Sequence, residues 1–356
     1  MNRRWIPHLR SPDDGAPLAL AMVERAQGDE IESGELLSTG SGRRFPIRAH
    51  IPRFVEDGGY AASFGVQWNR YRAVQIDRLN GTTISRDYLL ASSGWTPDEL
   101  GGARVLEVGC GAGRFTQVLL DAGAEVYAFD ATEAVDACWA TNGPHERLRL
   151  VQADLYAPPF PRGFFDRILC YGVLQHTRDV HGAFLALVPF LRPGGSIAID
   201  VYRKRWWLYR WTAKYWYRPL TKRLPTSLLM RIVEWYVPRW LPVDIWCQRV
   251  PLLRWIVPAI VPCWNYTGVL PLDREQLTQW AILNTFDALS AWYDSPQTPA
   301  AVRSWLAEAG LGDVQVRLGG NGILAAGRRP SEEPGRPGLT RAGEIAPKPR
   351  AATAAG

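Results

Sequence analysis

The stretch from Arg104 to Asp130 constrains the fold of this chain more than any other. A short apolar run leads into three glycines at alternating positions, and a second apolar run ends in an acid: Gly109, Gly111, Gly113 and Asp130. This order predicts a buried strand, a tight turn, a helix and a parallel strand. Glycines let backbone N–H groups approach a ligand, and the helix N-terminus attracts a carboxylate or a phosphate. An acid at the end of the second strand can accept both hydroxyls of a ribose.

Two classes of cofactor fit such a unit, and the glycine spacing separates them. A dinucleotide fingerprint needs G-x-G-x-x-G, but its third glycine would fall on Arg114 or Thr116. With Glu107 before the glycines, the segment instead resembles motif I of the class I S-adenosylmethionine-dependent methyltransferases. The alternative is a tight turn between strand and helix that binds nothing.

Strand and helix patterns alternate from Gly101 to Tyr202, which predicts a parallel sheet with right-handed crossovers. A C-terminal hairpin is predicted on either side of Gly-Gly-Asn-Gly, after a helix capped by Thr298. The strands are expected at 104–109, 125–130, 148–152, 166–171, 195–202, 314–318 and 323–327. The fold implied is α/β and Rossmann-like, a seven-stranded and mostly parallel sheet with an antiparallel last strand. A helical cap is inserted after strand five, and a small β-rich module precedes the sheet.

Further segments resemble the same methyltransferase family in order and spacing. Gln152-Ala-Asp154-Leu155 follows the third strand, Tyr171-Gly-Val-Leu-Gln-His176 follows the fourth, and Leu191-Arg-Pro-Gly-Gly195 precedes the fifth. The resemblance implies S-adenosyl-L-methionine as cofactor, with Asp154 at the adenine amino group. The implied cofactor-binding residues are Glu107, Gly109, Gly111, Gly113, Asp130, Asp154, Leu155 and Tyr171.

The reaction implied is transfer of a methyl group to an O- or N-nucleophile by in-line displacement. The protein then mainly has to align the acceptor and exclude water, and a base is needed only if the nucleophile must lose a proton. His176 is the candidate base, and its alternative role is to shape the cofactor pocket. Trp68, Asp287 and Tyr293 are candidate substrate residues that could equally be structural. A small-molecule or lipid- or glycan-linked acceptor is implied by the resemblance alone.

Residues 1–56 are expected to form a separate small module. Their Phe-Pro-Ile and Ile-Pro-Arg-Phe segments resemble the zinc ribbon of the methyltransferase-activator family. The positions of its four cysteines are taken by Ser11, Asp14, Ser38 and Ser41, and hydroxyls are poor zinc ligands. We therefore expect a ribbon without metal, the alternative being an unrelated β-rich arm.

Residues 57–100 are expected to form a helical lid across the cofactor site. Four side chains at helical spacing share one face of this segment, namely Phe64, Trp68, Tyr71 and Gln75. Such a stripe either lines a pocket or belongs to the plain core.

The insertion at 202–293 differs in composition from the rest of the chain. Residues 202–266 hold nine of the sixteen tryptophans, among them Trp206, Trp207 and Trp211. Residues 203–254 hold twelve Lys or Arg and two acids, a local balance of +10 in a chain of +6. Seven prolines predict short helices. Three interpretations stay open: a substrate-binding cap, a cap whose residues 202–266 also contact anionic membrane, and a surface for nucleic acid.

The remaining expectations concern location and partners. No apolar run reaches the roughly 20 residues that span a bilayer, there is no secretory signal, and the five cysteines lack C-x-x-C spacing. We expect a cytoplasmic protein, peripheral to the inner face of the membrane if the cap binds lipid, with a disordered tail at 328–356. An RNA methyltransferase is less favoured, because Tyr171-Gly-Val-Leu stands where a base-amine enzyme would have Asn-Pro-Pro-Tyr. A non-catalytic cofactor-binding regulator is the other alternative.

Overall fold

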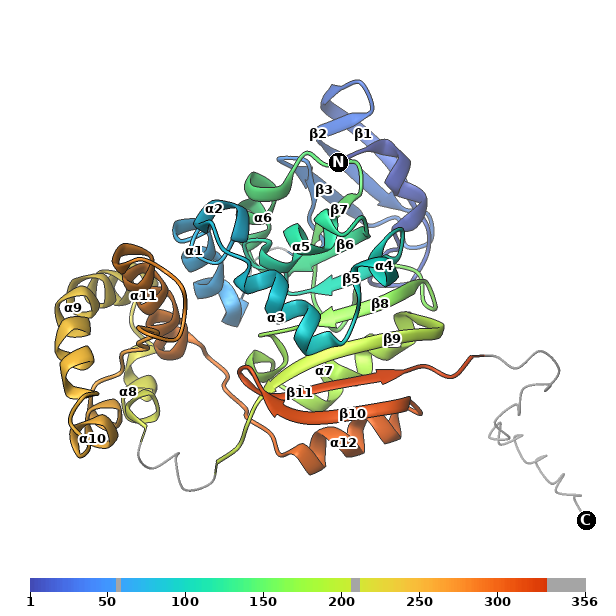
Figure 1. Cartoon of the computed structure of the whole chain (residues 1–356). Helices are drawn as coiled ribbons and strands as arrows, with labels where there is room; N and C mark the ends of the chain where they lie inside the picture. The colour runs from blue at the N-terminus through green and yellow to red at the C-terminus, as the bar shows by residue number, and fades with distance from the viewer. Residues whose placement is uncertain (56–58, 206–211, 332–356) are drawn as a thin grey trace, which may run out of the picture.

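A seven-stranded sheet forms the centre of the computed structural model, which describes residues 1–55, 59–205 and 212–331 (Figure 1). Its strand order is β10-β11-β9-β8-β5-β6-β7, and β11 runs against the other six. The strands are β5 (Arg104–Val108), β6 (Glu125–Asp130), β7 (Leu148–Gln152), β8 (Phe165–Cys170), β9 (Leu191–Tyr202), β10 (Gly312–Gly319) and β11 (Gly322–Arg328). The predicted Rossmann-like fold is confirmed.

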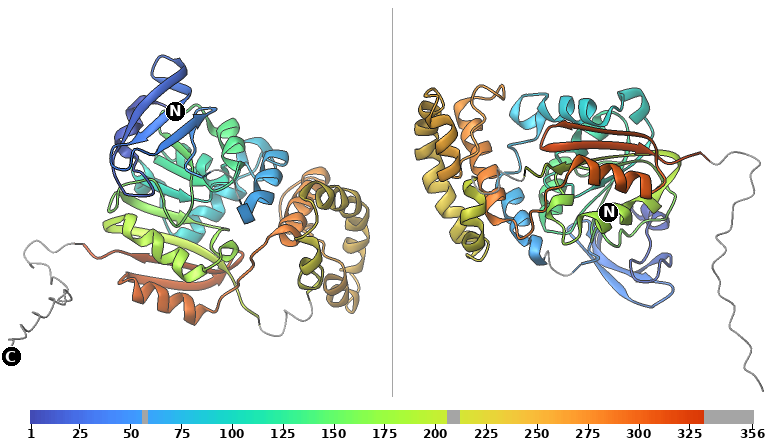
Figure 2. Two further views of the ribbon diagram at one scale, coloured as in Figure 1. Left: turned by 180° about the vertical axis from the view of Figure 1, so that it is seen from behind. Right: turned by 90° about the horizontal axis from the view of Figure 1, so that it is seen from below.

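Helices cover both faces of this sheet, because strand residues alternate between two cores (Figures 1 and 2). On β5, Val105 faces the core shared with α3 (Ile84–Ser93), α5 (Arg114–Asp121) and α6 (Ala134–Asn142). Leu106 and Val108 face the core shared with α7 (Val180–Leu187) and α12 (Pro299–Glu308). Thr298 caps α12 by accepting from the Ala301 N–H at 3.2 Å, as predicted.

The N-terminal module has its own sheet but shares its core with the larger one. It comprises β1 (Leu18–Gln27), β2 (Glu30–Ser38), β3 (Arg44–Arg48) and β4 (Ile51–Pro52), preceded by the 3-10 helix η1 (Arg3–His8). Arg53 forms an isolated parallel β-bridge with Gln152, the last residue of β7. Trp5 and Phe45 pack in the same hydrophobic core as Tyr127 of β6. The expected separate N-terminal sheet is confirmed, and it buries one face against the central sheet. The division of residues 1–56 from the rest of the chain as a domain stays a prediction.

The four positions that resemble zinc ligands do converge in space. Asp14 Oδ2 accepts the Ser38 hydroxyl at 3.0 Å and the Ser41 N–H at 2.7 Å. Hydrogen bonds from the Ala16 N–H and from these donors hold the pKa of Asp14 below its usual range. Within the described residues no cluster of three His, Cys, Asp or Glu side chains could hold a metal ion. A carboxylate bonded to hydroxyls and N–H groups thus joins the two turns, and the loss of a metal stays a prediction.

The lid is divided into short helices. After η2 (Gly59–Ala61) come α1 (Ala62–Arg70), α2 (Asp77–Asn80), α3 and α4 (Pro97–Leu100). The expected single stripe from Phe64 to Gln75 is wrong, because α1 ends at Arg70. Asp77, the first residue of α2, connects this helix to α3. Its carboxylate accepts the N–H groups of Ser85 and Arg86 at 2.9 Å each.

The cap inserted after β9 is helical, as predicted, and projects to one side of the sheet (Figures 1 and 2). It contains α8 (Ala213–Thr221), α9 (Thr226–Cys247), α10 (Leu253–Ile260) and α11 (Arg274–Ser290). Trp206, Trp207 and Trp211 lie outside the described residues. Among the described residues, none of the helices combines the length and the hydrophobicity that spanning a bilayer requires.

The expectation that prolines confine the cap to short helices is wrong for α9. This helix runs through Pro238 and Pro242 over 22 residues. Each proline removes one backbone hydrogen bond, but a buried row on α9 packs against α11 and keeps the helix continuous: Leu229, Met230, Val233, Val237 and Leu241.

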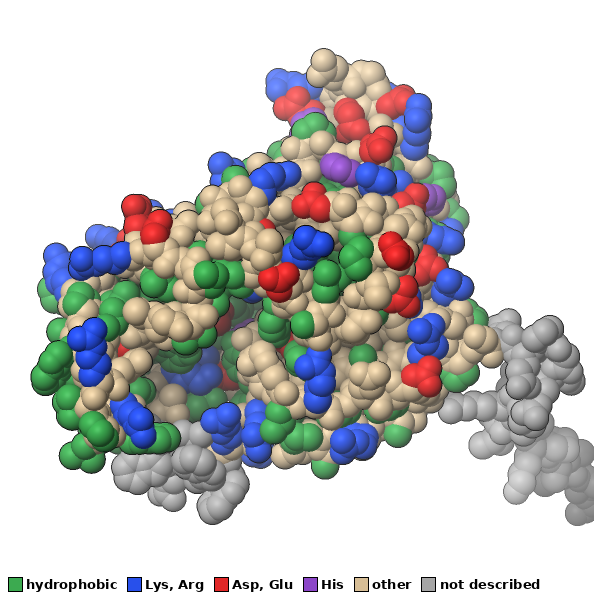
Figure 3. Space-filling view, viewed as in Figure 1, with side chains coloured by type: hydrophobic (Ala, Val, Ile, Leu, Met, Phe, Trp, Pro, Cys, Tyr) green, Lys and Arg blue, Asp and Glu red, His purple; other side chains and the backbone are tan. Residues whose placement is uncertain are grey.

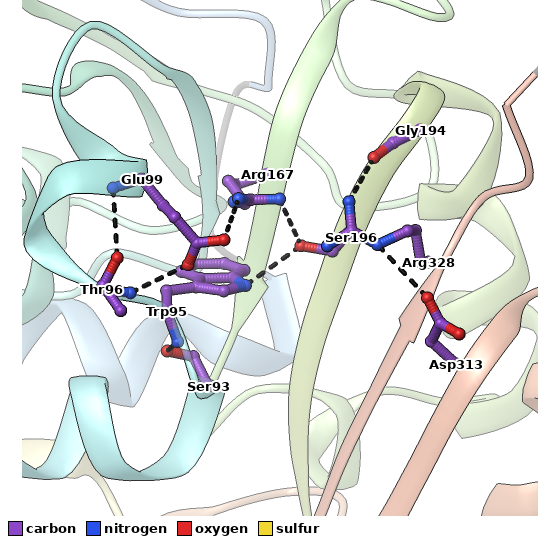
Figure 4. A network of polar contacts seen from close by, with 9 residues as sticks. All are labelled: Ser93, Trp95, Thr96, Glu99, Arg167, Gly194, Ser196, Asp313 and Arg328. Carbon is purple, nitrogen blue, oxygen red and sulfur yellow. Dashed lines mark hydrogen bonds and ion pairs between the residues drawn. The ribbon is translucent and has the colours of Figure 1, made fainter.

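A polar network closes the amino-terminal end of β8 and β9 (Figure 4). The Ser196 hydroxyl accepts from Trp95 Nε1 at 3.1 Å and from Arg167 Nη1 at 3.0 Å, and Arg167 pairs with Glu99 at 3.2 Å. Arg328, the last residue of β11, donates to the Gly194 carbonyl at 2.9 Å. Most of the predicted tail, 332–356, lies outside the described residues.

Candidate functional site

A cavity of about 520 Å³ lies at the carboxyl ends of β5, β6, β8 and β9. Its walls come from the glycine loop, α1, the hairpin between β10 and β11, and α11 of the cap. The surface is hollowed between the cap and the sheet domain (Figure 3). Open parallel sheets bind ligands at this edge, so the topology brings together residues distant in sequence.

The glycine loop has the backbone that its sequence predicts. Gly109, Gly111 and Gly113 have φ values of +69°, +52° and +85°, a region that side chains disfavour. Gly109 and Gly111 line the cavity. Gly113 does not line the cavity. It packs against α6, where a Cβ at this position would lie 2.1 Å from the Asn142 side chain. The third glycine therefore permits helix packing and is not part of the cavity wall.

Glu107 lies beneath the loop and does not line the cavity. Its carboxyl accepts the hydroxyl of Thr116 on α5, and burial raises its pKa to about 8. The side chain therefore links β5 to the helix that follows the glycines. A role in cofactor binding stays a prediction for Glu107.

Asp130 ends β6 and faces the cavity. One oxygen accepts the N–H and hydroxyl of Thr132 at 2.9 and 2.7 Å, and the other accepts the Gly111 N–H at 3.1 Å. Burial raises the pKa of Asp130 above its usual value, while these donors act in the opposite direction. The carboxylate is thus oriented by the loop that it adjoins, with acceptor capacity left for a ligand.

Three other predicted cofactor residues line the same cavity. Asp154 is exposed, and its Oδ1 accepts the Tyr156 N–H at 3.0 Å. Leu155 is buried beside it. Tyr171, at the end of β8, packs edge-on against Phe115 with ring centroids 5.7 Å apart. Asp130, Asp154, Leu155 and Tyr171 therefore all line one cavity.

His176 follows β8 and reaches the cavity between two aromatic rings. Its Nδ1 lies 3.0 Å from the carbonyl oxygen of Tyr293, and its ring centroid is 5.2 Å from that of Phe64 and 5.5 Å from that of Tyr202. Because a carbonyl only accepts, Nδ1 carries the proton, and Nε2 of the neutral ring has the free lone pair. This tautomer suits a proton acceptor.

Two of the three predicted substrate residues line the cavity, and the third does not. Trp68 lines the cavity from α1, and Asp287 lines it from α11. Tyr293 is not in the lining. Its backbone carbonyl orients His176, and its ring packs edge-on against Tyr60 at 5.0 Å.

Two charged residues in the cavity wall were missed by the sequence analysis. Arg114 follows the glycines, and its guanidinium donates to Ser85 Oγ at 2.9 Å and Gln75 Oε1 at 3.3 Å. It also lies over three aromatic rings, with 4.8 Å to the centroid of Phe115. Burial lowers its pKa. A cation in the first turn of a helix was a usable signal, because this position normally favours acids.

Asp200 is the second missed residue, fully buried near the end of β9. Its oxygens accept from the Gly172 N–H, from the Tyr88 hydroxyl at 3.1 Å and from Asn321 Nδ2 at 3.2 Å. Burial raises its pKa above the usual value. The signal was an acid within the apolar run Ile197-Ala-Ile-Asp-Val201, because an isolated charge is costly in a buried strand.

The strand, loop and acid at the centre of this cavity also match known proteins. Residues 106–199 match a family model described as a methyltransferase domain. This segment is a methyltransferase-family domain. It contains the glycine loop, Asp130, Asp154 and His176, whereas the cap and the N-terminal module lie outside the match.

Curated relatives match this methyltransferase-family domain over part of their length. An uncharacterized protein of Synechococcus is 37% identical over 111 residues, 29% of this chain and 26% of the relative. The ubiquinone biosynthesis O-methyltransferase of Xanthomonas euvesicatoria is 34% identical over 106 residues, 29% of this chain and 44% of the relative. The match therefore spans less than half of either relative.

A solved structure aligns with more of the chain. Human N-acetylserotonin methyltransferase in complex with SAM has 15% identity and a TM-score of 0.42, with 75% of this chain and 57% of that chain covered. The assignment of the domain depends on the family match and on the sheet topology described above.

Proposed function

We propose that this protein is an S-adenosylmethionine-dependent methyltransferase whose cofactor occupies the cavity beside the glycine loop. The observation that carries the proposal is Asp130, a half-buried carboxylate at the end of β6 that accepts the Gly111 N–H and lines the cavity. Such a carboxylate suits the two hydroxyls of a ribose. Leu155 adds an apolar contact for a flat base, and Asp154 can accept from an exocyclic amine.

The charges elsewhere in the cavity fit an amino acid moiety. Arg114 presents a half-buried guanidinium, and Asp200 presents a fully buried carboxyl in the same cavity. A zwitterionic α-amino-carboxylate carries both opposite charges on one carbon, so it matches this pair, whereas a second phosphate of a dinucleotide would meet Asp200 unfavourably. We assign the carboxylate to Arg114 and the ammonium to Asp200.

The acceptor is assigned to the part of the cavity closed by the cap. Tyr266, Trp280, Asn284 and Asp287 line it there, and Trp68 lines it from α1. This mixture of rings and amide or carboxyl groups suits a small-molecule or lipid- or glycan-linked acceptor with an apolar body and a few polar substituents.

Catalysis in this proposal needs alignment and one proton acceptor. The bound cofactor supplies an electrophilic methyl group. The cap and α1 hold the acceptor and exclude water, an alignment that can contribute roughly 7 to 11 kcal/mol. His176 Nε2 takes the proton of an acceptor hydroxyl, while the Tyr293 carbonyl keeps Nδ1 protonated and the ring in place.

The deciding experiment is incubation of the purified protein with a native extract and methyl-labelled S-adenosylmethionine, followed by mass spectrometry. We expect a labelled small or lipid-linked product that is absent when Asp130→Ala replaces the wild type. Asp98→Ala, at an exposed acid on α4, is the matched control and should retain the product. Cofactor binding without any labelled product would instead identify a regulatory protein.

A further inference from the structure

The outer face of the cap exposes an unusual amount of apolar surface. On α8, α9 and α10 the large side chains that stay 55–71% exposed include Leu220, Trp235, Trp246, Trp255 and Ile260. We call the outward side chains of residues 213–260, which are these three helices and the turns that join them, the cap surface. Hydrophobic and basic side chains gather along this outer edge (Figure 3). Contiguous apolar patches of this kind mark interaction sites in proteins.

The exposed apolar side chains are not part of the buried face of these helices. One row of α9 is buried against α11, through residues such as Val233 and Val237, while Leu228, Ile232 and Trp235 face outward. The apolar helix α10 has no buried residue at all. An apolar helix normally buries one face, so the cap surface lacks a partner among the described residues.

Charge on the cap surface has a single sign. Residues 212–261 contain two acids, and both turn inward. Glu234 is bonded to Arg70 and to the Tyr71 hydroxyl. Asp244 is buried and accepts from Gln248 and Asn265. Five exposed cations form no ion pair with an acid among the residues that the structure describes: Arg223, Arg231, Arg239, Arg249 and Arg254.

Two of these arginines form cation–π contacts with exposed tryptophan rings. The Arg239 guanidinium lies 5.0 Å from the Trp235 ring centroid, and that of Arg254 lies 5.5 Å from the Trp255 ring centroid. Indole rings have an apolar body and a polar N–H, and arginine keeps its charge at a lipid headgroup while its stem covers apolar surface. This combination is suited to the boundary between headgroups and acyl chains.

We propose that the cap surface docks on a lipid bilayer with anionic headgroups. Charge complementarity favours this occupant over a second copy of the chain, because two copies meeting through this surface would oppose two sets of arginines. The proposal does not depend on methyl transfer, since no residue of α8, α9 or α10 lines the cavity assigned to the cofactor and the acceptor.

The test is flotation of the full chain with two kinds of vesicle at 0.1 M salt, phosphatidylcholine alone and phosphatidylcholine with 30% phosphatidylglycerol. We expect binding to the anionic vesicles, a fall at 0.5 M salt, and at least tenfold less binding to the neutral ones. Arg231→Ala with Arg249→Ala should weaken the anionic binding by about thirtyfold, because each arginine near such a surface contributes roughly a factor of five.

The aromatic contribution is tested by Trp235→Ala with Trp255→Ala, which should lower binding to the anionic vesicles even at low salt. Leu318→Ala with Arg25→Glu changes exposed side chains on β10 and β1 and should bind as the wild type does. Melting curves confirm that each variant is folded. Equal binding to both kinds of vesicle, or none to either, overturns the proposal. Light scattering that shows a dimer lost in the tryptophan variant would assign the surface to a second copy and would also overturn it.

Discussion

The two ends of the central sheet carry buried polar groups in different ways. At the amino-terminal end, Trp95 and Arg167 both donate to Ser196, and Arg167 also pairs with Glu99, so these side chains bind one another (Figure 4). At the carboxyl end, Asp130 and Asp200 are held by N–H and hydroxyl donors yet still face a cavity. Pairing among side chains stabilises the fold, whereas a carboxylate oriented toward open space is available to a ligand.

The largest effect expected from this comparison of the two sheet ends is that of His176→Gln, at the carboxyl end. If Nε2 accepts the acceptor proton, kcat should fall by about 10² to 10⁴ while the affinity for S-adenosylmethionine is unchanged. Single-turnover kinetics with the identified acceptor measures this. His181→Gln, at a half-exposed histidine paired with Glu308 at 2.9 Å, is the control. An unchanged kcat would leave His176 with only a shaping role.

Asp130→Ala should have the next largest effect, on binding. Loss of two hydrogen bonds to a charged carboxylate costs roughly 3 kcal/mol, or about a hundredfold in affinity. Calorimetric titration with S-adenosylmethionine measures it, and Asp98→Ala should bind normally. Equal affinity of the two variants would remove the central support for the proposed cofactor site.

Glu107 predicts a pH dependence of stability beneath the cavity. Its pKa is raised to about 8 in the folded state, from 4.5. Between these values the folded state holds a proton that the unfolded state has lost, so the free energy of unfolding falls as pH rises. The loss is about 2 kcal/mol between pH 6 and pH 8, because the slope of about 1.36 kcal/mol per pH unit falls to half as pH reaches the folded-state pKa.

Glu107→Gln should remove this loss, because glutamine stays neutral at every pH. Urea unfolding of both proteins at pH 6 and pH 8 measures the difference. Parallel pH curves for the wild type and the variant would show that Glu107 is charged in the folded protein.

Ser196→Ala, at the amino-terminal end, should have the smallest effect. It leaves the buried Trp95 N–H without its acceptor, at a cost of about 1 to 3 kcal/mol in the free energy of unfolding. The affinity for S-adenosylmethionine should not change. Urea unfolding and calorimetry measure the two quantities, with the exposed Ser227→Ala as control. Weakened cofactor binding would show that the two ends are not independent.

Much of the sheet domain was predictable because its signals are local. The five parallel strands lie within a few residues of their predicted positions, and Thr298 was correctly predicted as the N-cap residue of α12. The glycine loop was equally explicit, since its three left-handed φ angles need glycine. Gly113 was assigned to the cofactor, however, although its neighbour is Asn142 on another helix.

The sequence by itself determined the order of strands and helices and the acids at the strand ends, since both follow from short-range periodicity and turn chemistry. Only the tertiary structure decided which charges share the cavity. Tyr88 bonds Asp200 across 112 positions of the chain, and the carbonyl of Tyr293 orients His176 across 117. It also decided that α9 continues through its prolines, because packing against α11 outweighs the lost backbone bonds. Contacts of this range depend on how elements pack, which no local pattern encodes.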